Sequence, residues 1–248
     1  MRDATTNPAS KLSTLALTAS ILLAGCGAGG GGGATGSAAA ARPTSFPTLD
    51  LAAVKAPAYA ETPFDYLGAK YARLVVEVSY DTAEPPAASI LAAIREKIAP
   101  RMQAKDVAFK VAPMLHLTAD GTAPTRAQLD AAEVATRSEL TGAGTITLHI
   151  LWLDEPMLNY AGLEIGPSSF AVLAAPSFDA AQQRDILVHE TGHILGLVSN
   201  GIPVQDKHHV AADQAHCNTA GCVMSPVLGQ GHEFCAACIE DLTACGGR

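Results

Sequence analysis

Basic side chains are scarce in this chain of 248 residues. Sixteen Lys and Arg stand against 24 Asp and Glu, which gives a formal net charge of −8. Proteins that bind nucleic acid need basic side chains to neutralise phosphates, so this balance argues against a nucleic-acid partner. It argues equally against electrostatic docking on an anionic lipid surface.

The N-terminal apolar run is too short for an ordinary membrane-spanning helix. It extends from Leu12 to Gly25, and Arg2 and Lys11 precede it. A short apolar run behind basic residues is typical of a removable targeting segment, so residues 1–25 are predicted to be a signal peptide.

The end of this run resembles the lipobox of bacterial lipoproteins. Residues 23–26 read LAGC. The resemblance implies cleavage before Cys26, acylation of Cys26 and a membrane anchor. Gly27 rather than Asp follows the cysteine, which favours an extracytoplasmic location at the outer membrane. A plain secretory leader or a buried free cysteine is the alternative.

A change of composition follows the lipobox. Residues 26–45 are dominated by Gly and Ala and offer few side chains to bury, so we expect a lipidated cysteine followed by a flexible linker. Residues 46–198 are predicted to form an α/β subdomain, and residues 199–248 a smaller subdomain rich in His and Cys. No internal repeat is visible.

Strands alternate with helices in the larger subdomain. Apolar and β-branched runs predict strands over 72–80, 107–117, 145–153 and 168–175. Helical spacing predicts helices over 87–102, 125–140 and 180–198. This alternation predicts an α/β layer with a twisted sheet, in which the run over 145–153 is buried on both faces.

The last predicted helix carries the motif HETGH at 189–193. Because His189 and His193 are four residues apart, both imidazoles project from one helix face and can share one zinc ion. Glu190 is placed to act as general base on a water molecule that the metal activates, and it does not bind the metal itself. The alternative is a surface helix that binds no metal and carries two solvated histidines. Gly196 can end the helix and turn the chain back toward the metal.

The extended motif resembles the metzincin pattern HExxHxxGxxH. His189, Glu190, His193 and Gly196 match it, whereas Ser199 stands at the position of the third histidine. The resemblance implies a zincin-like α/β (α+β) fold with a twisted mixed sheet, an antiparallel edge strand, a long active-site helix and a small Cys-rich C-terminal subdomain. The third zinc ligand must then come from elsewhere.

The tail resembles that of the archaemetzincins. Residues 216–224 read HCNTAGCVM and residues 235–238 read CAAC. The resemblance implies that His216 is the third zinc ligand, after an insertion of 17 residues. It also implies that Met224 forms the methionine turn beneath the metal.

Other residues compete with His216 for the third ligand position. His208 and His209 lie in the insertion and could supply nitrogen, whereas Asp206 and Asp213 could supply oxygen. His216 is favoured because it directly precedes the first cysteine of the matched tail.

The remaining histidines are predicted to have structural roles. His116 and His149 lie within predicted strands, where a histidine more often completes hydrogen bonds in the core than binds a metal. His232, beside Glu233, is predicted to be a loop residue.

The tail cysteines are predicted to hold a second, structural zinc ion. This ligand set is Cys217, Cys222, Cys235 and Cys238. Outside the cytoplasm, oxidation to disulfides is the alternative. Cys245 matches nothing in the pattern, and it is either free or paired in an oxidised tail.

In metzincins the strand before the active-site helix forms the sheet edge and pairs with the peptide substrate. Residues 168–175 match that place, so they are expected to bind an extended peptide. No tyrosine follows Met224 directly, and residues 42–70 contain no cysteine of the kind that blocks the metal in a prodomain.

Together these patterns predict a zinc metallopeptidase, acting as an endopeptidase or an aminopeptidase, with one catalytic and one structural zinc ion. The alternatives are a zincin-like domain that binds metal or a partner without catalysis, and a disulfide-stabilised lipoprotein with an accidental HExxH.

Overall fold

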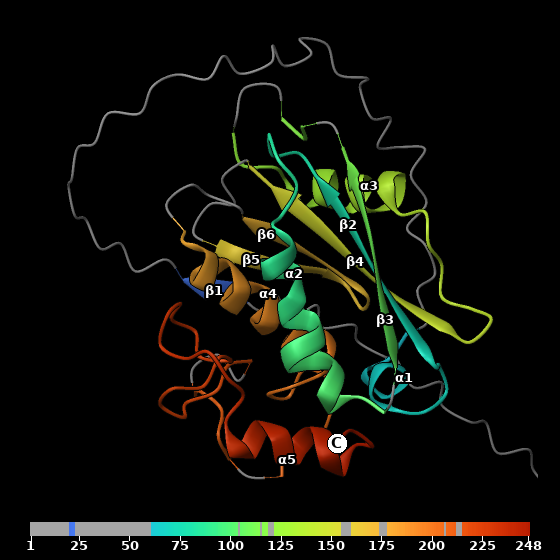
Figure 1. The fold of residues 1–248 in the computed structure, drawn as a ribbon. Coiled ribbons are helices and arrows are strands. Elements are labelled where there is room, and N and C mark those ends of the chain that lie inside the picture. Colours follow the sequence, from blue (N-terminus) through green and yellow to red (C-terminus); the bar gives the residue numbers. More distant parts are fainter. Residues whose placement is uncertain are drawn as a thin grey trace, which may run out of the picture.

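The computed structural model in Figure 1 describes a mixed α/β fold. It describes residues 20–22, 61–103, 105–114, 116–118, 122–154, 160–173, 178–205, 207–211 and 215–248. The predicted linker, the lipidation site Cys26 and the candidate ligands Asp206 and Asp213 lie outside these ranges, as does most of the predicted signal peptide.

Six strands form one sheet in the order β1-β5-β6-β4-β2-β3. Their bounds are β1 Ser20–Leu22, β2 Arg73–Tyr80, β3 Asp106–Pro113, β4 Thr145–Leu153, β5 Tyr160–Gly166 and β6 Ser169–Leu173. The pairs β2–β3, β2–β4 and β4–β6 are parallel, whereas β5 is antiparallel to β6 and to β1. The sheet is therefore mixed, with its antiparallel strands on one side.

The prediction that residues 168–175 form the sheet edge is wrong. Strand β6 lies within this run, and it pairs with β4 on one side and β5 on the other. β5, which the apolar pattern did not reveal, continues the sheet beyond β6. Gly162, Glu164 and Gly166 interrupt its apolar residues, so the run lacks the dense β-branched signal of the central strands.

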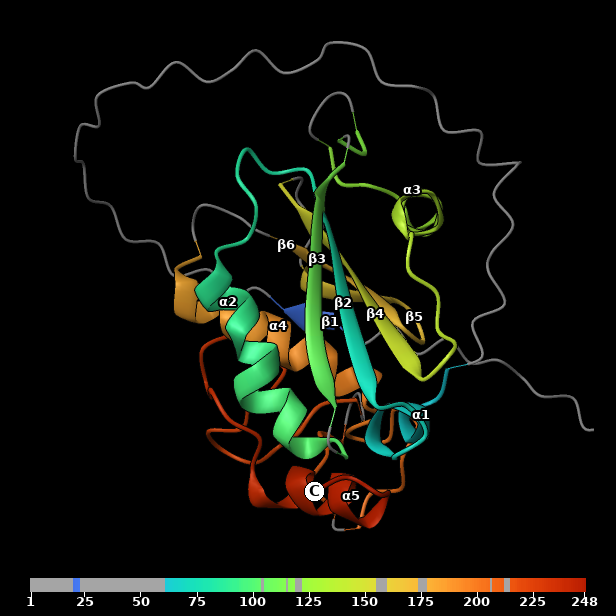
Figure 2. The same cartoon turned by 45° about the vertical axis from the view of Figure 1, so that its right-hand side comes forward.

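The helices cover both faces of the sheet. Their bounds are α1 Pro63–Leu67, α2 Ala88–Ala93, α3 Arg126–Thr136, α4 Ala180–Ile194 and α5 Ala236–Ala244, and α2 continues in a π turn over Ile94–Ile98 and a 3-10 turn over Ala99–Arg101. Figure 2 shows α3 on one side of the strands and α2 with α4 on the other. Every helix within the described ranges is too short or too polar to cross a bilayer.

Strand β4 packs against both helical layers, as its dense apolar sequence predicts. Ile150 and Trp152 belong to the core beneath α2 and α4. Leu151 and Leu153 pack with α3, where Leu129 lies in the same cluster. This alternation follows from the two-residue period of a strand.

Helix α4 has defined ends. Asp179 accepts a hydrogen bond from the backbone N–H of Gln182 at 2.8 Å, and the Gln182 side chain accepts from the Asp179 N–H at 2.9 Å. This capping box fixes the first turn. After Ile194 the chain turns at Gly196, whose φ of +83° suits glycine. α4 is therefore shorter than the predicted helix over 180–198.

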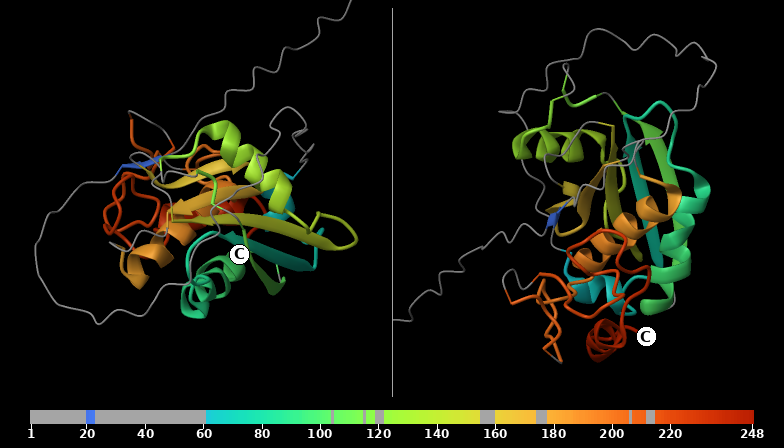
Figure 3. Two further views of the ribbon diagram at one scale, coloured as in Figure 1. Left: turned by 90° about the horizontal axis from the view of Figure 1, so that it is seen from above. Right: turned by 90° about the vertical axis from the view of Figure 1, so that its left-hand side faces the viewer.

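The tail after α4 forms loops and ends in α5, which was not predicted as a helix. Figure 3 shows this red segment gathered at one end of the sheet, below α4. α5 contacts the 3-10 turn that follows α2. The tail also lies next to the helix that carries the HETGH motif, because Met224 lies against Gly192 of α4.

Candidate metal centres

Helix α4 brings the two histidines and the glutamate of its motif into the interior. His189, Glu190 and His193 are each about 1% exposed. The two rings lie edge to face with their centroids 4.7 Å apart, and their Nε2 atoms are separated by 2.9 Å. The helical spacing of four residues produces this approach, because it stacks the two side chains on one face.

His216 lies beside this pair. Its ring centroid is 5.2 Å from that of His189 and 5.3 Å from that of His193, and it is 2% exposed. One ligand atom from each of the three imidazoles lies within 4.8 Å of the others. Ser199, at the position of the third histidine in the metzincin pattern, is exposed.

The orientation of His189 depends on the tail. Its Nδ1 donates a hydrogen bond to the carbonyl oxygen of Val223 at 2.8 Å. A histidine ligand commonly donates its second ring nitrogen in this way, which fixes the tautomer and directs the other nitrogen to the metal. Here Nε2 is the nitrogen that faces His193.

Met224 packs directly against α4. A Cβ built on Gly192 would lie 2.4 Å from the Met224 sulfur and 3.1 Å from a ring carbon of Phe234. Only glycine at this position allows the methionine and the helix backbone to approach so closely. Met224 therefore lies against the same turn of α4 that carries the two histidines.

The carboxylate of Glu190 is buried without a hydrogen-bond partner among the described residues. Burial, and then the charge of Glu164, raises the pKa of the Glu190 carboxyl well above its ordinary value. Gly162 of β5 lies against this side chain, since a Cβ there would be 2.2 Å from Oε1. A buried and unsatisfied carboxylate is costly for folding, so its position points to a chemical role.

The imidazole group fits a divalent metal. Burial, and then the charges of His189 and His216, lowers the pKa of His193 well below its ordinary value. Neutral imidazoles are the form that binds a metal, and three of them beside a carboxylate match the donor set of a catalytic zinc site.

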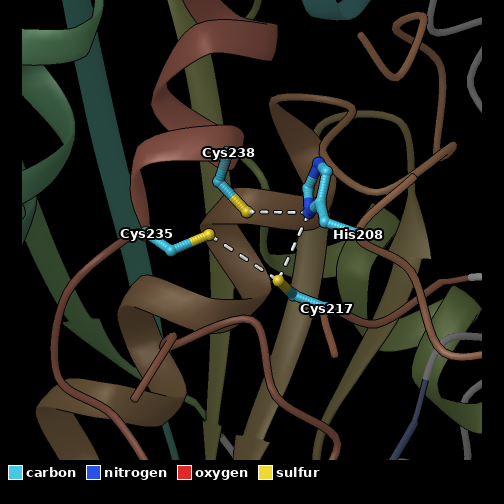
Figure 4. A group of neighbouring side chains, drawn as sticks. All are labelled: His208, Cys217, Cys235 and Cys238. Atoms are coloured by element: carbon cyan, nitrogen blue, oxygen red, sulfur yellow. Dashed lines mark hydrogen bonds between the residues drawn. The ribbon is translucent and has the colours of Figure 1, made fainter. Parts of the chain in front are cut away.

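A second group of metal-ligand residues lies between the tail loop and α5. It comprises His208, Cys217, Cys235 and Cys238, whose ligand atoms all lie within 4.8 Å of one another (Figure 4). The sulfur of Cys217 is 3.7 Å from that of Cys235 and 3.3 Å from Nδ1 of His208. The sulfur of Cys238 is 3.8 Å from the same nitrogen.

Cys222, the fourth cysteine of the predicted set, lies next to this group. Its sulfur is 3.7 Å from that of Cys238 and accepts a hydrogen bond from the backbone N–H of Cys235 at 3.4 Å. Each cysteine that the structure describes is a free thiol, including the half-buried Cys245. The predicted cysteines are thus brought together, with His208 added to them.

The structure separates the competing histidines. His208 belongs to the cysteine group, and His209 belongs to neither group of candidate ligands found in the described ranges. The sequence did not distinguish these positions, because the insertion has no regular period. Asp241 was missed altogether, although its spacing of three residues from Cys238 on α5 could have suggested a shared helix face.

The other histidines make local contacts. His149 is fully buried between Ser79 and Glu133, with its Nε2 3.0 Å from the Ser79 oxygen and its Nδ1 3.4 Å from Glu133 Oε1. His116 lies after β3 and pairs with Asp81 at 3.4 Å. His232 Nδ1 is 2.6 Å from an oxygen of Asp185.

Comparison with known proteins gives one weak likeness. No protein-family model matches the chain, and no curated protein matches it. Among solved structures the chain is similar to the crystal structure of an archaemetzincin from Methanopyrus kandleri. The sequence identity is 21%, the TM-score is 0.48, and the match covers 70% of this chain and 94% of that chain.

Proposed function

We propose that this chain is a zinc metallopeptidase. The observation that carries the proposal is the convergence of three buried imidazoles, from His189, His193 and His216, next to a buried carboxylate on the same helix. A structural role explains this arrangement poorly, because both oxygens of Glu190 lack a hydrogen-bond partner in the described part of the chain.

The three histidines would hold the metal. The chemistry that zinc would supply there is a lowered pKa of a bound water and polarisation of a peptide carbonyl. Glu190 would accept a proton from the attacking water and later deliver it to the leaving amine. Burial raises the pKa of the Glu190 carboxyl, and a raised pKa makes a carboxylate a stronger base toward the proton of the water.

Strand β5 offers a place for an extended peptide. Gly162 in this strand touches Glu190, so a chain paired along β5 would pass beside the proposed general base. The three residues of β1 already pair with β5 in an antiparallel register, Ser20 opposite Leu163 and Leu22 opposite Tyr160. Pairing through backbone groups would accept many sequences, which fits a peptide or protein substrate.

Two further parts of the proposal come from sequence motifs. The lipobox implies a lipid anchor at Cys26 and an extracytoplasmic location, with the membrane as a partner. The tail cysteines imply a second zinc ion with a structural role, and the thiols of Cys217, Cys235 and Cys238 lie close enough together to share one.

The test is the substitution Glu190→Gln in the zinc-loaded protein, assayed against a peptide library. Zinc content should stay the same, because Glu190 is not a ligand. The rate should fall about 10²- to 10⁴-fold, which is the usual contribution of general acid–base catalysis. Glu96→Gln is the matched control, since Glu96 is an exposed partner of Arg184 and should leave the rate unchanged.

Two outcomes would contradict the proposal. Unchanged hydrolysis in Glu190→Gln would show that this carboxylate is not the base. A wild-type protein that binds zinc at the three histidines and cleaves no peptide in the library would favour the alternative, a non-catalytic metal- or partner-binding domain.

A further inference from the structure

The second metal centre gathers more donors than one tetrahedral ion needs. Three segments supply them: the loop with His208, the segment with Cys217 and Cys222, and the start of α5 with Cys235 and Cys238. A structural zinc site uses four ligands, so one of these five residues must remain outside. The Cys222 sulfur is 3.7 Å from that of Cys238, so this distance alone does not exclude it. Cys222 nevertheless lies outside the group of four residues whose ligand atoms are all within 4.8 Å of one another.

Three separations within the group in Figure 4 match those of a tetrahedral zinc site. With zinc–sulfur bonds of about 2.3 Å, two thiolates of one tetrahedral site lie about 3.8 Å apart. With a zinc–nitrogen bond of about 2.05 Å, a nitrogen and a sulfur lie about 3.6 Å apart. The observed separations are 3.7 Å for the sulfurs of Cys217 and Cys235, and 3.3 and 3.8 Å from the His208 nitrogen to Cys217 and Cys238.

The second nitrogen of His208 is already occupied. Its Nε2 lies 2.8 Å from an oxygen of Asp241, a residue of α5 that is completely buried. The other oxygen of Asp241 accepts the backbone N–H of Gln205 at 2.7 Å. When Nε2 donates its hydrogen to this carboxylate, the lone pair of Nδ1 faces the sulfurs. A carboxylate behind a histidine is the usual support of a metal-binding imidazole.

We propose that His208 is the fourth ligand of this centre, together with Cys217, Cys235 and Cys238, and that Cys222 remains a thiol beside it. Charge favours this choice. Zinc with four thiolates carries a charge of −2, whereas three thiolates and a neutral imidazole leave −1. The site is buried and already holds the carboxylate of Asp241, so the smaller negative charge costs less to bury.

The proposed ligand ties the insertion to the first centre. The backbone N–H of Val210 donates to the carbonyl of His216 at 2.7 Å, and that of Asn218 donates to the carbonyl of His208 at 2.8 Å. Between these two hydrogen bonds, His209 and Cys217 form an antiparallel β-bridge of the backbone. An ion bound by both His208 and Cys217 would hold the two paired segments together. Because His216 directly precedes Cys217, this ion would also help to hold a ligand of the first centre in place.

The test uses cobalt in place of zinc in the full-length protein with its thiols reduced. Charge transfer from thiolate to cobalt arises at the cysteine centre alone, because the ligands of the first centre are imidazoles. Its intensity grows with the number of bound thiolates, so the readout is independent of peptide hydrolysis and of the proposed function.

Cys222→Ser should leave both the charge-transfer intensity and the cobalt affinity unchanged. His208→Ala should weaken cobalt binding at this centre by about 100-fold or more, since loss of a supporting partner alone costs 10- to 100-fold. Asp241→Asn should weaken it by about 10- to 100-fold, and it gives a second measure if His208→Ala does not fold. His209→Ala, at the neighbouring position, is the matched control and should have no effect.

The opposite pattern would overturn the assignment. A four-thiolate site predicts that Cys222→Ser removes about a quarter of the charge-transfer intensity and that His208→Ala leaves the affinity unchanged. Absence of any charge-transfer band in the reduced wild-type protein would reject the centre itself.

Discussion

The position of the Glu190 side chain depends on Gly162 in the neighbouring strand β5, because a residue with a side chain would not fit there. A Cβ on Gly162 would fall 2.2 Å from Oε1 of Glu190 and 2.5 Å from its Cδ and Cγ. Such a contact is far below the van der Waals distance, so one of the two groups would have to move. The side chain of Glu190 is the more adaptable partner, since it makes no hydrogen bond within the described residues.

The substitution Gly162→Ala should therefore displace Glu190 and leave the metal in place. We expect peptide cleavage to fall by about 10- to 100-fold, because a displacement of about 1 Å in a catalytic group can cost that much. Zinc content should not change, since the three atoms nearest to a Cβ at Gly162 all belong to Glu190 and not to a histidine. The measurement is kcat/KM beside zinc stoichiometry and thermal unfolding.

Gly142→Ala is the control for this prediction. A Cβ at Gly142 would meet nothing within 4 Å, so the same chemical change should be silent there. Wild-type activity in Gly162→Ala would mean that catalysis does not depend on the observed position of Glu190.

At the level of elements, the segment over 216–224 serves both metal centres. It supplies His216 to the first centre and Cys217 to the second. Its Val223 carbonyl orients His189, and Met224 packs against Gly192. The backbone N–H of Cys217 also donates to the carbonyl of Met224 at 2.8 Å, which closes the segment on itself. Order at the cysteine centre should therefore determine how well the first centre is assembled.

The double substitution Cys235→Ser plus Cys238→Ser tests this coupling. Bound zinc should fall from two ions to one, because the second centre loses two ligands. The remaining ion should bind at least about 10-fold more weakly, as expected when the supports of a ligand are loosened. Competition with a chelator of known affinity measures both effects.

Cys245→Ser is the matched control, since Cys245 lies outside both ligand groups. If the double variant retains full zinc affinity at the three histidines, the two centres are independent.

An element could be predicted when the residues that indicate it are close together in the sequence. The run over 145–153 could be recognised as a buried strand because its residues are apolar on both faces, and His189, Glu190 and His193 could be grouped because a helix repeats every 3.6 residues. β5 could not be recognised, since Gly162 and Glu164 interrupt its pattern. α5 was missed because its sequence was interpreted as a metal loop.

The place of His208 among the cysteines could not be predicted from the sequence, whereas the prediction of His216 beside the two histidines of α4 agrees with the structure. His208 and His216 both lie in segments without a regular period, and their places depend on the ladder formed by Val210, Asn218 and their partners. Long-range pairing of this kind has no local signature. The family resemblance favoured His216, and it offered nothing for His208 or Asp241.

At the scale of the whole molecule, the N-terminal segment and the candidate active site meet at β5. Strand β1 belongs to the predicted signal peptide and yet pairs with the outer side of β5, whose inner side pairs with β6. Gly162 of β5 lies against Glu190. A substrate that pairs with β5 would need the edge that β1 occupies.

A protein that begins at Cys26 should therefore cleave peptides with a lower KM than the chain that retains residues 1–25, at unchanged kcat. We expect a difference of about 2- to 10-fold, because a three-residue pairing is weak while a tethered segment competes at an effective concentration near millimolar. Ile21→Pro in the long form should act in the same direction, since proline disrupts strand pairing. Equal KM values for all three proteins would show that β1 does not compete for β5, and would place peptide binding on another surface.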